Sequence, residues 1–245
     1  MSQNIDTIVE AIKNLKAYSI SPVIENNMPG FVSNPGCSIV HDARVFEKHH
    51  YYCQTLIIGE HIGAHIDAPA HTVPGGKTIE KFEPGYFFAP YKLLDTRPYN
   101  LEAADIVTPE MCEEMAKNGG IVINPGDIVL FCFGWDKYYL PEAMEGPERN
   151  FYGMNGPGLS EDSCKYLVSK KIKAVGSDSI LGTIARKGDH TVSLCCHDVY
   201  FLPNNIPIIE GLINLTALPA EGFFTALPLG IKNGSGSPVS AVAFG

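Results

Sequence analysis

The sequence predicts an α/β domain whose strands run in mixed directions. Three observations support this fold class. Short segments rich in Val, Ile and Tyr alternate along the chain with segments in which apolar residues recur at helical spacing. Two of the helical segments begin with recognisable capping residues. The 245 residues contain no repeat, low-complexity tract or clear linker, so we expect a single domain over residues 1–245.

The first part of the chain alternates between helix, loop and strand. Its first element is a predicted amphipathic helix, whose apolar residues are Ile5, Ile8, Val9, Ile12 and Leu15. The Pro- and Gly-rich stretch 26–36 predicts a loop, and 38–46 and 51–58 predict strands. A Gly-Gly turn at 75–76 and a strand at 91–95 follow.

The middle of the chain contains two helices with clear N-termini. Thr108 is a capping residue that precedes Pro109 and the early acid Glu110, and this helix should stop near 119–120. Ser160 is a good N-cap for a second helix over 161–170.

The remaining segments continue the alternation. Strands are predicted at 128–133, 173–176, 207–215, 223–229 and 239–244. A polar loop is predicted over about 177–190, a helix over 191–202 and a flexible turn in the NGSGSP stretch at 233–238.

Composition excludes several classes of protein. The net charge of −9 argues against a nucleic-acid partner, which usually requires a basic face. There is no run of about 18 apolar residues, so no membrane span is expected. The N-terminus lacks the pattern of a signal peptide, and a cytoplasmic protein is expected. Charged residues make up 18 %, below the roughly 25 % that is typical, which favours a homo-oligomer, a dimer or a tetramer.

The cysteines indicate reduced thiols. They are Cys37, Cys53, Cys112, Cys132, Cys164, Cys195 and Cys196. Their number is odd, no C-x-x-C pair occurs and several lie in apolar runs, so buried thiols are favoured over a disulfide framework.

Three of the eight histidines lie in one eleven-residue segment, which is the strongest functional signal in the chain. His61, His65, Asp67 and His71 all stand at odd positions, so an extended strand would place them on one face. A straight strand would separate His61 from His65 by about 13 Å, too far to share a metal ion. The chain must therefore bend, and Gly63 permits a bend. The alternative is a solvated strand face with chance histidines.

This segment resembles the H-x-G-T-H-x-D-x-P-x-H signature of the cyclase family of metal-dependent hydrolases, which includes bacterial kynurenine formamidase and isatin hydrolase. Ala64 stands where the family usually has Thr. Weaker matches follow in the family's order: YSISP at 18–22, PGDIVL at 125–130, GW at 134–135, PGLS at 157–160 and VGSD at 175–178. The resemblance implies a mixed β-sheet with a barrel-like core flanked by helices, the swivelling β/β/α fold of the formamidases.

The resemblance also implies a two-metal site. Its ligands would be His61, His65, Asp67, His197 and Glu210, with Asp67 bridging the two ions. One or two divalent ions are expected, and imidazole and carboxylate ligands suit Zn²⁺ and Mn²⁺ alike. Glu210 lies in an apolar run, where coordination would offset the cost of burying a carboxylate; the alternative is a surface acid. His190 is a competitor expected in a solvated loop, and His41, His49 and His50 show no ligand pattern.

The implied activity is hydrolysis of a C–N bond, in an amide, N-formyl group or lactam of a small, aromatic substrate. His71 would be the general acid–base that moves the proton of a metal-activated water to the leaving group. Trp135, Phe31 and Met28 are candidate pocket walls, or else ordinary core and loop residues. Two alternatives stay open: a cyclase, dehydratase or lactonase that uses the same site, and a member that binds metal or ligand without catalysis.

Overall fold

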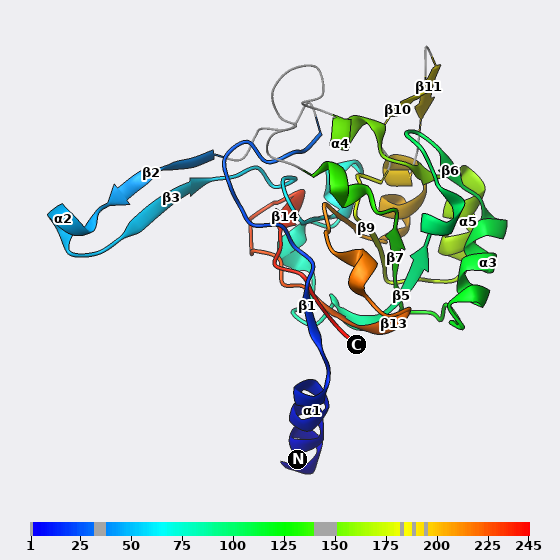
Figure 1. Ribbon diagram of the computed structural model, residues 1–245, viewed down its shortest axis with the longest axis horizontal. Helices are drawn as coiled ribbons and strands as arrows, with labels where there is room; N and C mark the ends of the chain where they lie inside the picture. Colours follow the sequence, from blue (N-terminus) through cyan, green and yellow to red (C-terminus); the bar gives the residue numbers. More distant parts are fainter. Residues whose placement is uncertain (1, 32–37, 140–150, 182–183, 188–189, 194–195) are drawn as a thin grey trace.

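A curled, nine-stranded mixed β-sheet organises the structure (Figure 1). The computed structural model describes residues 2–31, 38–139, 151–181, 184–187, 190–193 and 196–245. The strands of this sheet are β1 (Ala17–Ser19), β4 (His65–Asp67), β5 (Phe88–Asp95), β7 (Ile128–Cys132), β9 (Ala174–Ser177), β12 (Ile208–Glu210), β13 (Glu221–Thr225), β14 (Gly236–Pro238) and β15 (Val242–Phe244). Their order across the sheet is β1-β15-β13-β5-β7-β9-β12-β4-β14.

Strand direction divides the sheet into a centre and two flanks. The central strands β5, β7, β9 and β12 are parallel to one another. Antiparallel strands continue the sheet on both sides, β13, β15 and β1 on one and β4 and β14 on the other. This arrangement confirms the predicted α/β class, mixed strand directions and barrel-like core.

Two helices, α3 (Pro109–Asn118) and α5 (Glu161–Ser169), pack against one face of the sheet. Their predicted caps are confirmed. The side chain of Thr108 accepts a hydrogen bond from the Met111 N–H at 3.4 Å, and that of Ser160 accepts one from the Ser163 N–H at 3.0 Å. These bonds satisfy amide groups that the first helical turn leaves without a partner.

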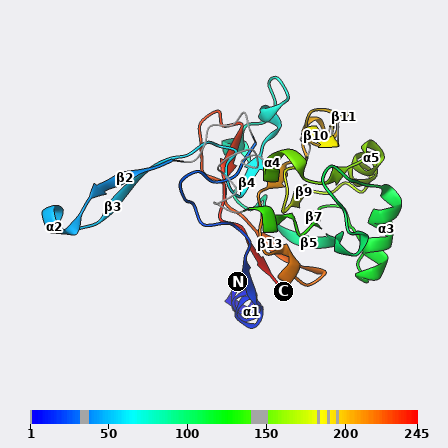
Figure 2. The same cartoon turned by 45° about the horizontal axis from the view of Figure 1, so that its top comes forward.

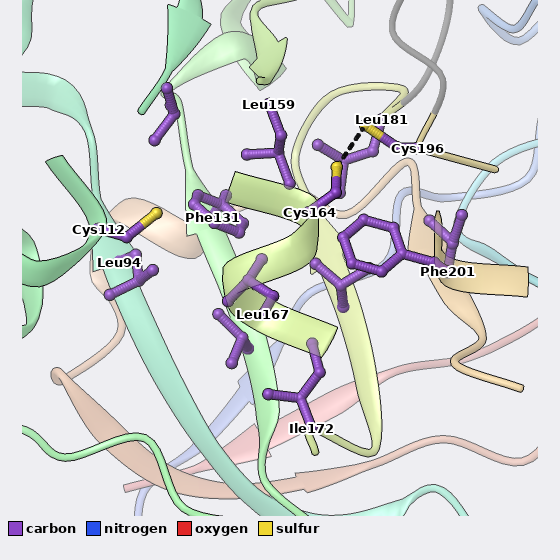
Figure 3. Packing of buried hydrophobic residues seen from close by; sticks show 14 of the residues in the cluster. Leu94, Cys112, Phe131, Leu159, Cys164, Leu167, Ile172, Leu181, Cys196 and Phe201 are labelled. Carbon is purple, nitrogen blue, oxygen red and sulfur yellow. Dashed lines mark hydrogen bonds between the residues drawn. The ribbon is translucent and has the colours of Figure 1, made fainter. Parts of the chain in front are cut away.

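Strand β7 is buried on both faces and separates two hydrophobic cores. Val129 and Phe131 point toward the helices, where Figure 3 shows Phe131 near Leu167. Ile128 and Leu130 point into the curl of the sheet and pack with apolar residues of the flanking strands. The alternation follows from the two-residue repeat of a strand, and burial on both faces explains why its sequence is continuously apolar.

Short elements complete the body of the molecule. They are the helix α4 (Phe151–Asn155), the paired strands β6 (Ile106–Val107) and β8 (Gly158–Leu159), the 3₁₀ turns η1 (Pro69–His71), η2 (Ile79–Lys81), η3 (Arg97–Tyr99), η4 (Trp135–Tyr138), η8 (Leu202–Asn204) and η9 (Leu215–Ala217), and the π-helical turn η7 (Cys196–Phe201).

Two elements project from this body, as Figures 1 and 2 show. One is helix α1 (Ser2–Asn14), the predicted amphipathic helix. The other, here called the arm, is the hairpin of β2 (Ser38–Arg44) and β3 (Cys53–Ile57), whose strands agree with the prediction; α2 (Phe46–His49) lies between them. Both expose large apolar side chains: Ile5, Ile8, Val9, Ile12 and Leu15 on or next to α1, and Phe46, Tyr51, Tyr52, Leu56 and Ile57 on the arm.

The structure corrects the prediction for residues 184–201. Strands β10 (Ile184–Lys187) and β11 (His190–Ser193) form an antiparallel hairpin where a polar loop and the start of a helix were expected. Only two residues, Gly188 and Asp189, connect these strands, and such a pair is a sequence signal for a hairpin. The helical part is shorter than predicted and consists of η7 followed by η8.

The C-terminal part differs from the prediction at four places. The NGSGSP stretch does not form only a flexible turn, because its last three residues are strand β14, which pairs with β4. The strand predicted at 207–215 ends at Glu210, because Gly211 has a φ of +68° that interrupts the extended backbone. The strands predicted at 223–229 and 239–244 appear as the shorter β13 and β15.

The described cysteines are free thiols, as predicted. Cys112, Cys132, Cys164 and Cys196 are buried and Cys53 is exposed, while Cys37 and Cys195 lie outside the described residues. None of the helices in the described part of the chain is both long and apolar enough to cross a bilayer.

Candidate metal centre

The histidine segment bends at the predicted glycine. Gly63 has a φ of +68°, a conformation that favours glycine. The bend places His61 in the loop before β4 and His65 at its first residue, with their ring centroids 5.4 Å apart. This separation replaces the roughly 13 Å of a straight strand.

Strand pairing brings Glu210 to this segment. In the antiparallel pair of β12 and β4, Glu210 lies opposite His65, and Ile208 lies opposite Asp67. The prediction that Glu210 ends the strand after His197 is confirmed. His197 itself lies on the π-helical turn η7.

The first trio consists of His61, His65 and Asp67. The Nδ1 atom of His61 lies 2.5 Å from Oδ1 of Asp67, and Nε2 of His65 lies 3.4 Å from the same oxygen. The Nδ1 atom of His65 lies 2.8 Å from the Gly63 carbonyl oxygen. One potential ligand atom from each residue lies within 4.8 Å of the others.

The second trio consists of Asp67, His197 and Glu210. Nε2 of His197 lies 2.9 Å from Oδ2 of Asp67 and 3.4 Å from Oε1 of Glu210. Asp67 therefore turns one carboxylate oxygen toward each trio, which is the geometry a bridging ligand needs. One potential ligand atom from each residue of this second trio lies within 4.8 Å of the others.

The buried acids of the two trios have opposite pKa shifts. Burial raises the pKa of Asp67, but hydrogen bonds with His197 and His61 outweigh it and hold the pKa well below its ordinary value. Burial raises the pKa of Glu210 to about 8, although nearby His197 acts in the other direction. Burial lowers the pKa of His197, but the charges of Glu210 and Asp67 raise it overall.

A divalent cation fits these residues. Oε1 of Glu210 is buried and receives no hydrogen bond from the part of the chain that the structure describes. A carboxylate oxygen in this position needs compensation, and a cation would supply it. Mixed imidazole and carboxylate ligands suit Zn²⁺ and Mn²⁺.

His71 lies beside both trios, at the end of η1. Its ring centroid lies 4.0 Å from that of His61 and 6.0 Å from that of His197. The outer side of His71 is open to solvent. Burial of its inner side lowers the pKa of His71 to about 4. The negative charge of Asp67 opposes this shift, and the charges of the neighbouring imidazoles add to it. His71 is therefore a neutral imidazole at neutral pH.

The predicted pocket residues occupy different environments. Met28 is buried beside the ligand segment, with its methyl group 3.0 Å from the position that a Cβ on Gly63 would take. Phe31 is half-buried at the edge of the hydrophobic core between the sheet and helices α3 and α5. Trp135 packs against Tyr138 and Phe151, and its indole N–H donates to the carbonyl group of Tyr152. Their role as pocket walls stays a prediction.

The other histidines lie away from the two trios, or their side chains lie outside the described residues. His49 and His50, which showed no ligand pattern in the sequence, are exposed near the tip of the arm. His190 belongs to strand β11, so its placement in a loop was wrong, and its side chain lies outside the described residues. The side chain of His41 also lies outside them.

Two polar residues next to the first trio were missed at the sequence level. Oγ of Ser235 lies 2.8 Å from Nε2 of His61, and Oε2 of Glu60 accepts a hydrogen bond from the same hydroxyl group at 2.6 Å. Ser235 lies in the stretch predicted to be a flexible turn, 174 residues from His61 in the chain. No local pattern could have indicated this contact.

The chain is similar in sequence to a known family and to known proteins. The family model described as "Putative cyclase" matches residues 18–181. Isatin hydrolase of Roseibium aggregatum is 30% identical over 196 residues, which cover 77% of this chain and 73% of the relative. Cyclase-like protein 1 of Oryza sativa subsp. japonica is 26% identical over 188 residues, which cover 74% of this chain and 61% of that protein.

Solved structures show the same fold. An isatin hydrolase bound to the product analogue thioisatinate has a TM-score of 0.83 at 25% identity, covering 100% of this chain and 99% of the other. Isatin hydrolase A from Ralstonia solanacearum has a TM-score of 0.82 at 22% identity, covering 100% and 97%. A protein described as a "potential metal-dependent hydrolase with cyclase activity" has a TM-score of 0.69 at 24% identity, covering 94% and 98%.

Proposed function

Because this chain belongs to the cyclase family of metal-dependent hydrolases, we propose that it cleaves a C–N bond in a small aromatic amide, N-formyl compound or lactam. The observation that carries the proposal is the pair of ligand trios that share Asp67, with the neutral imidazole of His71 beside them. The name of the Roseibium aggregatum relative, isatin hydrolase, supports a cyclic aromatic substrate.

We assign the ligands by trio. His61, His65 and Asp67 would hold one divalent ion, and Asp67, His197 and Glu210 would hold a second, each Zn²⁺ or Mn²⁺. A cation bound there supplies Lewis-acid chemistry, because it lowers the pKa of a coordinated water and polarises a carbonyl oxygen.

His71 moves the proton in this proposal. Its imidazole takes a proton from the water that adds to the carbonyl carbon, and gives that proton to the nitrogen as the C–N bond breaks. The products are a carboxylic acid and an amine, or the corresponding amino acid when the substrate is a lactam. A pKa of about 4 keeps the imidazole able to accept a proton at neutral pH.

We infer the walls of a substrate pocket from the residues that lie near the histidine segment 61–71. Met28 lies against Gly63, and Tyr139 packs against Met28 and Ile62 as part of the same small apolar cluster. Met28, together with Phe31 and Trp135, would provide the apolar walls that an aromatic ring needs.

A panel of substrates tests the proposal. The metal-loaded protein is offered isatin, an N-formyl aromatic amine, a simple lactam and a lactone, and the products are separated by chromatography. Ring opening or deformylation supports the proposal. Turnover of the lactone alone favours a lactonase, a ring-closed product favours a cyclase, and loss of water without hydrolysis favours a dehydratase. No turnover despite bound metal favours a non-catalytic binding protein.

We also propose that the partner of this chain is a second copy of itself. Helix α1 and the arm expose apolar residues that the body does not cover. A single short helix and an isolated hairpin are marginally stable in water, so both elements gain from a partner. The arm has two acidic and two basic residues, so it carries no net charge that another acidic copy would repel.

A further inference from the structure

We propose that Glu60 and Ser235 act as positioning residues that fix which ring nitrogen of His61 binds a cation. The three residues form a chain of hydrogen bonds. The Ser235 hydroxyl donates to Oε2 of Glu60 at 2.6 Å, and Oγ of Ser235 lies 2.8 Å from Nε2 of His61. The backbone N–H of Ser235 donates to the same Glu60 oxygen at 3.0 Å. The inference rests on the proposed function only in that His61 is a ligand.

The direction of these hydrogen bonds determines the tautomer of His61. A carboxylate accepts hydrogen bonds and donates none, so the hydroxyl hydrogen of Ser235 points to Glu60. The oxygen of Ser235 can then only accept a hydrogen bond from the ring of His61. Nε2 of His61 therefore carries a proton, and Nδ1 is the ring nitrogen that is left to give a lone pair to a cation in the first trio.

The other tautomer would compete with the cation. A proton on Nδ1 would be donated to Oδ1 of Asp67, which lies 2.5 Å away. That hydrogen bond would satisfy both side chains without any metal ion. The hydrogen bonds from Glu60 through Ser235 oppose a ring whose single proton is on Nδ1, because the lone pair of Nε2 would then face the lone pairs of the Ser235 oxygen. They therefore favour the form that can bind a cation through Nδ1.

The backbone around Ser235 holds it in place. Its carbonyl oxygen accepts a hydrogen bond from the Ala68 N–H at 2.9 Å, close to the end of β4. The next residue, Gly236, lies so near His61 that a Cβ atom there would be 2.6 Å from the ring atom Cε1. The ring of His61 is thus confined between strand β14 and the ring of His71, and rotation of the imidazole is restricted.

The neighbouring ligand has a simpler arrangement. Nδ1 of His65 lies 2.8 Å from the Gly63 carbonyl oxygen, which can only accept a hydrogen bond. His65 therefore presents Nε2 to the site, whereas His61 presents Nδ1. Of these two ligands, His61 is the one whose second ring nitrogen contacts a side chain, so substitution can test its arrangement.

The test compares Glu60→Ala with Glu60→Gln. Both remove the negative charge, but Gln keeps an acceptor oxygen for the backbone N–H and hydroxyl of Ser235. In Glu60→Ala the hydroxyl group of Ser235 loses its acceptor and can donate to Nε2 of His61 instead. Nε2 would then accept a hydrogen bond, and the ring proton would be on Nδ1. The presence of a proton on Nε2 of His61 is measured in metal-free protein by ¹H–¹⁵N NMR, with signals assigned by their loss in His61→Ala. Mn²⁺ affinity is measured by titration.

We expect a proton on Nε2 of His61 in the wild type and in Glu60→Gln, and its partial or complete loss in Glu60→Ala. Mn²⁺ affinity should fall about 10- to 100-fold in Glu60→Ala and distinctly less in Glu60→Gln. Ser235→Ala should lose affinity like Glu60→Ala, and Ser235→Thr should restore most of it.

Three results would overturn the proposal. They are an Nε2 atom of His61 without a proton in the wild type, equal Mn²⁺ affinity in Glu60→Ala and the wild type, or equal losses in Glu60→Ala and Glu60→Gln with no change in the protonation of Nε2. Because the protonation of Nε2 is read without metal or substrate, it stands apart from the hydrolysis assay. A failure of the proposed function would instead appear as absence of turnover with the proton on Nε2 in place.

Discussion

Gly211 lies directly against the carbonyl group of Gly63, so closely that a Cβ atom on Gly211 would overlap the carbonyl oxygen. The contact joins the residue after Glu210 to the bend between His61 and His65. It therefore holds the two trios at a fixed separation.

Replacing Gly211 with alanine should destabilise the protein and disturb the candidate metal centre. Gly211 has a φ of +68°, and the added methyl group meets backbone rather than a movable side chain. We expect a loss of about 3 kcal/mol in the free energy of unfolding, measured with urea. Gly75→Ala is the matched control, since Gly75 also has a positive φ but faces open space, and it should lose only about 1 kcal/mol. Equal losses in the two variants would show that the Gly63 contact is unimportant.

The shared carboxylate predicts different metal contents for two variants. Asp67→Asn should impair both trios, whereas Glu210→Gln should impair only the second. Metal analysis after dialysis against Zn²⁺ or Mn²⁺ should find almost no ion in the first variant and about half the wild-type content in the second. Circular dichroism checks that both variants are folded. Full metal content in Asp67→Asn would contradict the assignment of Asp67 as a bridging ligand.

His71 should be needed for turnover and not for metal binding. In His71→Ala we expect wild-type metal content and a fall in kcat of about 10²- to 10⁴-fold, the usual contribution of a general acid–base. Because its pKa of about 4 keeps the wild-type imidazole neutral, protonation of His71 should reduce kcat only as the pH falls toward 4. A fully active His71→Ala variant would refute this role.

Asp178 should make stability fall as the pH rises. The backbone N–H groups of Phe133 and Gly134 donate to its carboxylate at 2.9 and 2.8 Å, but burial dominates and raises its pKa to about 7. The folded state then binds this proton more tightly than the unfolded state, so stability is highest below the unfolded pKa near 4 and is lost as the pH rises through 7. The stability of the wild type relative to Asp178→Asn should drop by about 2 kcal/mol between pH 5 and pH 7 in urea unfolding. A constant difference would mean that Asp178 does not titrate in this range.

The proposed second copy predicts that charge on α1 will dissociate the assembly. Ile8→Lys combined with Ile12→Lys places two cations on the exposed apolar stripe of α1. Light scattering should detect a multiple of 26.6 kDa for the wild type and a smaller mass for the variant. Thr7→Lys combined with Asn14→Lys, which adds the same charge at polar positions of the helix, is the control. A monomeric wild type at micromolar concentration would disprove the proposal.

Local signals explain why much of the fold could be predicted. The caps at Thr108 and Ser160 and the apolar run of β7 each specify an element within a few residues. The bend at Gly63 followed from distance alone, since a straight strand could not bring His61 and His65 together.

Long-range contacts explain the errors. Strand β14 forms because it pairs with β4, and nothing in the residues 236–238 themselves favours a strand. The same holds for Ser235, whose contact with His61 depends on that pairing. The hairpin of β10 and β11 was missed for another reason, since the Gly-Asp pair between its strands was interpreted as part of a loop.

Strand β14 also affects how the protein matures during synthesis. Ser235 and Gly236 complete the surroundings of His61, yet a ribosome makes them long after the histidine segment. A nascent chain that ends before them has His61 and Asp67 but lacks the residues that confine and orient the His61 ring. The first trio therefore reaches the geometry described here only after Ser235 and Gly236 have left the ribosome and strand β14 has paired with β4.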